Sequence, residues 1–174
     1  MFGARELPEL RKLVKDHFVG GTIYQAFLDP WCYHRWHSPV SGTIRKSYKL
    51  EGTYYLSNPG LPIEDSSIYI DSQPMLSIVS VRQVYIIQLD DGSGRCVAVI
   101  EIGMAEVSSI NSTVIEGQKI EKGDQLGYFA FGGSSYVMVF DKNMEMEFDE
   151  DTFKANKDGE SDKVFVNAKL CSFK

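Results

Sequence analysis

Two stretches of the sequence combine residue types that can carry out acid–base or nucleophilic chemistry. The first, WCYHRWHSPVSGTI (Trp31–Ile44), contains His34 and His37, two of the three histidines in the chain. The second, FGGSSYVMVF (Phe131–Phe140), places Ser134 after two glycines and ahead of an apolar, β-branched run. Imidazole carries protons near neutral pH, and a serine hydroxyl becomes a nucleophile when a base takes its proton. The two stretches together could form a nucleophilic site.

The paired histidines allow more than one interpretation. As metal ligands they lack a visible set of carboxylate or cysteine partners, and as residues of an aromatic strand they could be hydrogen-bonded core residues. Residues three apart in a regular strand face opposite sides, so both rings reach one site only where the backbone bulges or turns near Pro39. The third histidine, His17, is expected to have a cap or surface role at the end of a helix.

The surroundings of Ser134 do not match a hydrolase nucleophile. The G-x-S-x-G elbow is absent, and the residues after Ser134 are typical of a strand rather than a helix. Gly133 can adopt the strained, accessible backbone that an attack on the preceding peptide bond requires. We therefore predict that Ser134 attacks the peptide bond that joins it to Gly133.

The elements that must position these residues are mostly strands. We predict a mostly β (α+β) fold, an antiparallel β-sandwich or barrel-like core with one flanking N-terminal helix. Leucines at three- and four-residue steps up to Phe18, with Gly20 and Gly21 after them, predict the helix. A hairpin is expected around Asp91–Gly94, and the acidic stretch Met144–Asp162 is expected to be a solvated connection. The predicted strands are Thr22–Leu28, Thr43–Leu50, Gln83–Leu89, Arg95–Ile102, Val107–Ile115, Leu126–Phe131, Ser135–Phe140 and Lys163–Phe173.

Composition limits the classes of function. The length of 174 residues predicts a single domain, and a net charge of −6 argues against a nucleic-acid surface. No apolar run is long enough for a membrane span, and no secretory signal precedes the helix. Three widely spaced cysteines favour a reducing compartment, without a disulfide framework or a metal site, so we expect a cytoplasmic protein.

Four segments, in order and at matching spacing between about Gly20 and Phe140, resemble the phosphatidylserine decarboxylase family of pyruvoyl enzymes. They are YHRWHSPVSG, EIGMAEVSS, EGQKIEKGDQLGYFAFGGSS and VMVF. Trp36, the GTI of Gly42–Ile44 and the doubled glycine before Ser134 are most similar to the fungal aromatic L-amino-acid decarboxylases, tryptophan decarboxylases among them.

The resemblance implies a self-cleaving proenzyme. The Ser134 hydroxyl attacks the Gly133 carbonyl to form an ester, β-elimination releases the Gly133 carboxylate, and the resulting dehydroalanine hydrolyses to a pyruvoyl group. The ketone then forms a Schiff base with the substrate amine and accepts the electrons released with carbon dioxide. The single catalytic domain 1–174 would consist of a β-chain, 1–133, and an α-chain, 134–174, that stay associated, and a homodimer is left open.

By the same resemblance, the two histidines take different roles. His37 is similar to the base that activates the serine during self-cleavage, and His34 to the residue that assists decarboxylation by protonating carbon. Gly132 and Ser135 are expected to give hydrogen bonds to the developing oxyanion, although a serine at a strand entrance often bonds only to local backbone. The aromatic rings of Tyr33 and Trp36 are expected to contact the substrate, with core packing as the alternative.

One part of the family pattern is not present. Many members carry an upstream aspartate that orients the histidine in an Asp–His–Ser triad, and Asp29 does not match its place. We expect the sequence to be a short form or a piece of a longer protein, and self-processing of this piece is left open.

Three functions from two classes are compatible with the sequence. Decarboxylation of an aromatic amino acid is favoured, because the chain is acidic and has no cluster of Lys and Arg for an anionic membrane. Phosphatidylserine decarboxylation, with a membrane-associated location, is the alternative. A non-catalytic β-hairpin binding module that kept the fold and lost the activity is the third, and the two histidines and the Gly133–Ser134 junction argue against it. Separately, the Gly-centred turns at Gly117 and Gly123 resemble the hairpin of biotinyl- and lipoyl-type carrier domains, which would need a lysine at the turn.

Overall fold

The structure, a computed structural model, describes residues 6–28, 32–60, 68–104, 109–130, 134–153 and 164–174. The chain groups into two compact units. One is Ile23–Val139, and the other combines Met1–Thr22 with Phe140–Lys174. The residues of the candidate site all lie in the first unit.

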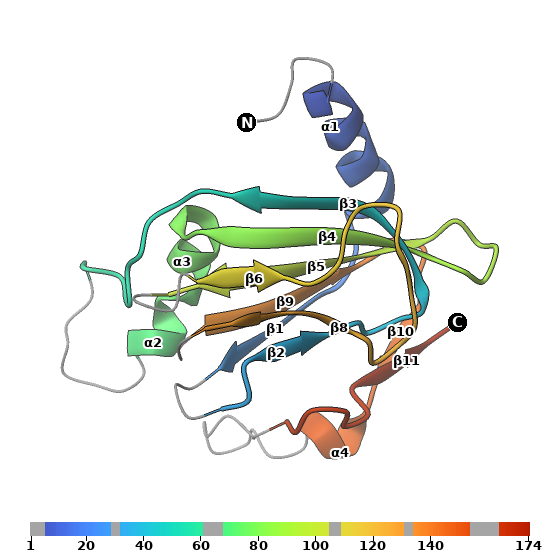
Figure 1. Cartoon of the computed structure of the whole chain (residues 1–174). Helices are drawn as coiled ribbons and strands as arrows, with labels where there is room; N and C mark the ends of the chain where they lie inside the picture. Colours follow the sequence, from blue (N-terminus) through green and yellow to red (C-terminus); the bar gives the residue numbers. More distant parts are fainter. Residues whose placement is uncertain (1–5, 29–31, 61–67, 105–108, 131–133, 154–163) are drawn as a thin grey trace. The chain divides into compact units, whose positions relative to one another are not determined.

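A six-stranded sheet forms the body of the first unit (Figure 1). The strand order is β1-β9-β5-β4-β3-β7, and the pairs β1–β9, β5–β4, β4–β3 and β3–β7 are antiparallel. The bounds are β1 Ile23–Leu28, β9 Ser134–Phe140, β5 Cys96–Gly103, β4 Arg82–Leu89, β3 Gly42–Leu50 and β7 Lys119–Ile120.

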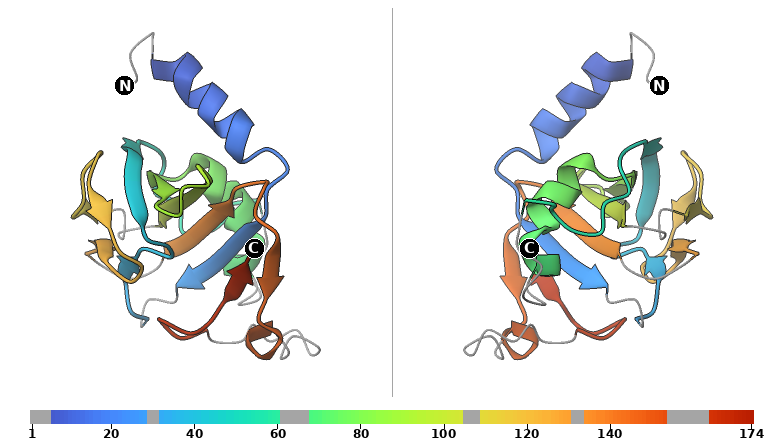
Figure 2. Two further views of the ribbon diagram at one scale, coloured as in Figure 1. Left: turned by 90° about the vertical axis from the view of Figure 1, so that its right-hand side faces the viewer. Right: turned by 90° about the vertical axis from the view of Figure 1, so that its left-hand side faces the viewer.

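A second sheet of three strands covers one face of the larger sheet. It has the order β2-β8-β6, with β2 Arg35–His37, β8 Gln125–Phe129 and β6 Ile110–Ser112. Two tyrosines of the larger sheet reach it: Tyr85 donates to the Leu126 carbonyl at 3.2 Å, and Tyr136 donates to the His37 carbonyl at 3.1 Å. Figure 2 shows β6 and β8 (yellow to orange) as a layer separate from β1 and β9.

The opposite face of the larger sheet meets helix α3 (Gln73–Val79), which follows the short helix α2 (Ile68–Asp71). The contact is polar at the start of β9, where the Ser135 hydroxyl donates to Gln73 Oε1. Pro74 stands in the first turn of α3, where its missing N–H has no helical partner to lose.

The core lies around the central strands β4 and β5. The middle of β4 is apolar or aromatic, and β5 is apolar except at Glu101, because layers cover these strands on both faces. The largest fully buried apolar side chains are Trp36, Tyr85, Ile44, Leu76, Ile86, Ile87, Ile102, Met104 and Leu126. Among the described residues, Glu101 is the one residue with an ionisable carboxyl group in the set of largest fully buried side chains.

The second unit contains helix α1 (Glu6–His17), strands β10 (Met146–Phe148) and β11 (Cys171–Phe173), and helix α4 (Glu150–Phe153). Its most buried polar contact joins His17 Nδ1 to Asp141 Oδ2 at 2.6 Å, with the Asp141 side chain 1% exposed. His17 therefore pairs with a buried carboxylate, contrary to the predicted cap or surface role.

The predicted fold class, a mostly β structure with antiparallel strands and one N-terminal helix, is confirmed. Other expectations were wrong or incomplete. The acidic stretch contains β10 and α4, the last predicted strand is limited to β11, and α2, α3, β2 and β7 were not predicted. These elements are short, so their pairing partners rather than their own sequence patterns decide them. Among the described residues, no helix has the length and apolar character needed to cross a membrane.

Candidate active site

Ser134 lies in the interior between the two sheets. It is the first residue of β9, pairs with Leu28 of β1, and is 0% exposed. Since alternate strand residues share a face, Ser134 points to the same side as Tyr136, which reaches the three-stranded sheet. His34 precedes β2 in that sheet, and its Nδ1 lies 3.2 Å from Ser134 Oγ. The structure thus joins a buried serine hydroxyl and the ring of a half-buried histidine.

His37 makes different contacts. The Gly123 carbonyl can only accept, so the His37 Nδ1 that lies 2.8 Å from it must carry the proton. The remaining nitrogen, Nε2, then accepts from the Tyr33 hydroxyl at 2.9 Å, and the two rings stack with centroids 5.7 Å apart. The basic nitrogen of His37 is therefore occupied by Tyr33.

The expected backbone irregularity is present, because the register of β2 against β8 shifts between Trp36 and His37. It does not bring the two rings onto one group in the described contacts: His34 meets Ser134, and His37 meets Tyr33 and Gly123. The role assigned to His37 in activating the serine remains a prediction that this geometry does not favour.

Ser135 faces away from Ser134. Its hydroxyl donates to Gln73 Oε1 of α3, and the same Gln73 oxygen accepts from Gln25 Nε2 at 3.1 Å. This network ties the start of β9 to the helix side of the sheet, so the geometry does not support the predicted oxyanion contact of the Ser135 side chain. Gly132 and Gly133 lie outside the described residues.

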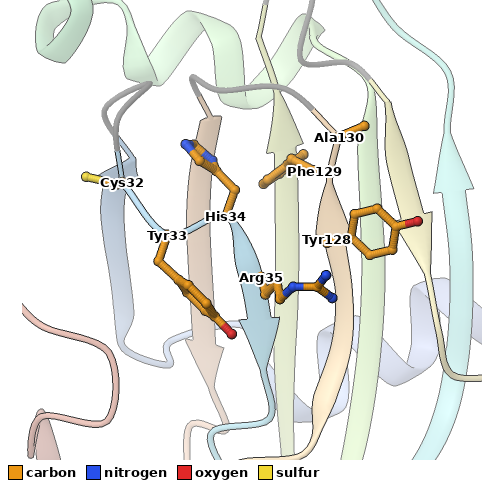
Figure 3. Close-up of a pocket in the computed structure, with 7 residues that line it drawn as sticks. All are labelled: Cys32, Tyr33, His34, Arg35, Tyr128, Phe129 and Ala130. Atoms are coloured by element: carbon orange, nitrogen blue, oxygen red, sulfur yellow. The ribbon is translucent and has the colours of Figure 1, made fainter.

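A pocket of about 520 Å³ adjoins His34 (Figure 3). That volume falls within the usual range for small-molecule sites. The Arg35 guanidinium points toward the Tyr128 ring, 5.1 Å from its centroid, and donates to Gln125 at 2.9 Å. The described residues that line the pocket are Cys32, Tyr33, His34, Arg35, Tyr128, Phe129 and Ala130. Tyr33 is therefore placed at the pocket as predicted for a substrate contact, whereas its contact with a substrate remains a prediction.

Trp36 takes a core position next to this pocket. It is 1% exposed, and its ring meets the edge of Phe129 at 4.8 Å between centroids. Within the part of the chain that the structure describes, no group of three or more His, Cys, Asp or Glu side chains could hold a metal ion.

The sequence matches the family model for phosphatidylserine decarboxylase over residues 1–171. The chain belongs to the phosphatidylserine decarboxylase family. It is 43% identical to decarboxylase iboD of Amanita muscaria over 80% of this chain, and 41% identical to the L-tryptophan decarboxylase of Psilocybe cyanescens over 72%. It is 34% identical to the phosphatidylserine decarboxylase proenzyme of Ruminiclostridium cellulolyticum over 95% of this chain.

The matched regions are only parts of these family members. The chain covers 43% of the Amanita protein, 30% of the Psilocybe protein and 51% of the Ruminiclostridium protein. It therefore spans about half or less of the length of these relatives.

Sequence reasoning missed one buried acid of this family member. Glu101 lies on β5, is 0% exposed, and has no hydrogen-bond partner for either carboxylate oxygen among the described residues. Burial raises its pKa well above the usual range of a glutamate. An acidic residue inside the apolar run CVAVIEIG was the available signal, since such a run otherwise predicts a fully buried strand.

Proposed function

We propose that the chain is a pyruvoyl-dependent decarboxylase, which makes its own prosthetic group from Ser134 and removes carbon dioxide from an L-amino acid. The observation that carries the proposal is the 3.2 Å contact of Ser134 Oγ with His34 Nδ1, at a fully buried position in a member of this family.

The residues present fit a pyruvoyl group at position 134. Bound there, the group supplies a ketone that accepts the substrate's amine and takes up the electron pair released with carbon dioxide. The surrounding interior excludes water, which strengthens electrostatic interactions with the reacting atoms. His34, which approaches from the facing sheet, holds a proton within reach of position 134.

His34 is the proposed proton carrier at this position. In the uncleaved chain its Nδ1 accepts the Ser134 proton as the serine oxygen attacks the Gly133 carbonyl. In the mature enzyme the same ring delivers a proton to the substrate carbon that loses carbon dioxide. The family resemblance instead names His37 for the first step, which would require His37 Nε2 to exchange the Tyr33 hydroxyl for the serine.

Intact-mass spectrometry of the purified chain tests self-cleavage. Wild-type protein should give fragments 1–133 and 134–174 in place of one chain of 174 residues, and the shorter fragment should react with hydroxylamine. Ser134→Ala should stay intact, while the matched control Ser135→Ala, whose hydroxyl faces Gln73, should still cleave. Cleavage of Ser134→Ala at the same bond would show that the nucleophile is a different residue.

The two histidines are separated by the same measurement. His34→Ala should slow cleavage by roughly 10²–10⁴-fold, the usual loss for one positioned proton carrier, and His37→Ala should affect it less. The opposite order, with His37→Ala uncleaved and His34→Ala cleaved, would overturn the geometric assignment and favour the one from the resemblance.

An aromatic amino acid is the favoured substrate. The support is the likeness to a protein named L-tryptophan decarboxylase, together with the aromatic ring of Phe129, which lies edge-on to His34. Phosphatidylserine is the second candidate, because the phosphatidylserine decarboxylase proenzyme matches 95% of this chain. Carbon dioxide release by cleaved protein should be measured with tryptophan, tyrosine, phenylalanine and phosphatidylserine vesicles. Turnover with the vesicles alone would exclude the amino-acid assignment.

A further inference from the structure

Glu101 shares the interior face that carries Ser134. In the β4–β5 register Glu101 pairs with Gln83 and Val99 pairs with Tyr85, so Glu101 and Tyr85 lie on one face of the sheet. Tyr85 reaches Leu126 of the covering sheet, which identifies that face as the interior one. Strand β5 is the direct neighbour of β9, where Ser134 and Tyr136 point to the same interior.

Glu101 interacts electrostatically with Tyr136, a residue next to the reaction centre. Burial is the main cause that raises the pKa of Tyr136, and the negative charge of Glu101 raises it further, followed by that of Tyr24. Tyr136 stands two residues from Ser134 on β9. Residues that stand opposite or diagonal to each other on one face of adjacent strands are about 5–8 Å apart, a span that a glutamate side chain and a small ligand can bridge.

The groups around Glu101 do not supply the donors that its carboxyl lacks. Among the described residues, the Tyr85 hydroxyl donates its hydrogen bond to the Leu126 carbonyl, and the Tyr136 hydroxyl donates to the His37 carbonyl. In the part of the chain that the structure describes, neither Glu101 oxygen has a hydrogen-bond partner. A buried polar group without partners is costly and uncommon, and it fits a site whose missing partner arrives with a ligand.

We propose that Glu101 binds the positively charged amino group of the substrate beside residue 134. The inference rests on the proposed function, since both candidate substrates carry an ammonium group next to the carboxylate that is lost. An ammonium ion offers three N–H donors and the opposite charge, which is what two unpaired carboxylate oxygens require. Because Ser134 is itself 0% exposed, any substrate that reaches it enters the interior that contains Glu101.

A second buried group without a partner complements Glu101. Trp36 Nε1 is a donor with no acceptor among the described residues. Trp36 is two residues from His34, so both side chains point from the covering sheet toward the larger one. An unpaired acceptor and an unpaired donor in one interior match the two charges of an amino acid, with its carboxylate toward Trp36.

Binding of an ammonium ion has a distinctive proton signature. Burial disfavours the charged form of the isolated Glu101 carboxyl and raises its pKa well above the usual range of a glutamate. A cation nearby favours the charged form, so the carboxyl releases its proton to solvent when the ammonium ion binds. Other titratable side chains on the elements around this interior are Tyr85, Tyr136, Tyr24, His34 and His37, and the variants below separate them from Glu101.

The test uses the Ser134→Ala chain, which cannot form the ketone, so amine binding is reversible and independent of catalysis. Tryptamine and ethanolamine serve as probes that separate an aromatic amine from a lipid-headgroup amine, and indole-3-propionate is the probe without an amine. Calorimetry in buffers of different ionisation enthalpy gives affinity and proton release together. We expect one of the two amines to bind, and its binding to release protons.

Adding Glu101→Gln should weaken amine binding roughly 10- to 100-fold and abolish the proton release. The matched control Glu116→Gln removes an exposed carboxylate that pairs with Lys46, and should change neither quantity. Glu101→Leu, which replaces an unpaired carboxyl by an apolar side chain, provides a folded second variant with the same expected loss. Melting curves establish that each variant is folded.

Equal affinity and equal proton release with and without Glu101 would overturn the inference, as would failure of both amines to bind to folded Ser134→Ala protein. The proposed function is judged separately, by cleavage and carbon dioxide release of the chain that keeps Ser134. A Glu101-dependent amine site in a chain that neither cleaves nor decarboxylates would refute the proposed function and leave the amine site standing.

Discussion

Replacing Gly127 by alanine should disturb the sheet that carries His34 and His37. Gly127 lies in β8, between Trp36 of β2 and Ser112 of β6. An added Cβ would lie 2.6 Å from Trp36 Cε3, and closer still to Trp36 Cζ3 and to the Asn111 carbonyl oxygen. Real Cβ atoms do not approach other heavy atoms so closely, so the ring or the backbone must move.

Neither obstacle can give way at little cost. Trp36 is 1% exposed and held against Phe129, and the Asn111 oxygen belongs to the backbone of β6. Overpacking a filled core usually costs about 1–3 kcal/mol, and two obstacles place this variant near the upper end. For a chain of this length each kcal/mol lowers the melting temperature by about 2–4 °C, which gives a fall of about 6–12 °C.

Thermal unfolding followed by circular dichroism measures this fall, with Gly60→Ala as the matched control. The nearest atom to a Cβ at Gly60 is the side-chain Oδ1 of Asn58 at 3.3 Å, so a small adjustment suffices and a change below about 1 kcal/mol is expected. A melting temperature of Gly127→Ala equal to that of Gly60→Ala would refute the packing argument. Combining Gly127→Ala with Trp36→Leu should relieve only the ring contact, because the Asn111 oxygen remains in place.

Two further predictions concern charges outside the candidate site. His17→Ala removes the histidine that lies 2.6 Å from the buried Asp141 carboxylate, and should lower the free energy of unfolding, measured in urea, by about 1–3 kcal/mol. The control Lys15→Ala, at an exposed position of the same helical turn, should change this free energy little. Equal effects of the two substitutions would show that the His17–Asp141 pair contributes nothing to stability. The hydroxyl and N–H of Ser93, with Arg95, lower the pKa of Asp91 to about 2, so its carboxyl resonance should titrate near pH 2 rather than near 3.8. Because the folded-state pKa of Asp91 is depressed, the stability that its charged form contributes is present above the unfolded-state pKa and is lost as pH falls from about 4 toward 2. Ser93→Ala should move the titration midpoint of Asp91 back toward 3.8. An unchanged midpoint would contradict the assignment of the shift to hydrogen bonds from Ser93.

Some features of the protein could be read from the sequence, because they depend on local pattern. The strands β3, β4, β5 and β9 contain β-branched and aromatic residues, and the hairpin tip has Gly92 and Gly94 at positive φ, so neighbouring residues determine these elements. The N-terminal helix follows its leucine periodicity in the same way. The residue types of the candidate site, Ser134 and the two histidines, also stand out by type and by family motif.

Tertiary structure alone decided which of these residues meet. Strands β2 and β7 are three and two residues long, too short for a periodic signal, and they exist because β8 and β3 pair with them. The packing of the two sheets brings His34 to Ser134, 100 residues along the chain, and His37, which follows the bulge in β2, contacts Tyr33 and Gly123. The environment of Glu101 is also decided by tertiary structure. Only the covering of both faces of β5 removes the Glu101 carboxyl from water, and it leaves the carboxyl without a hydrogen-bond partner among the described residues. Such contacts depend on register and layer packing between distant segments, which no local pattern encodes.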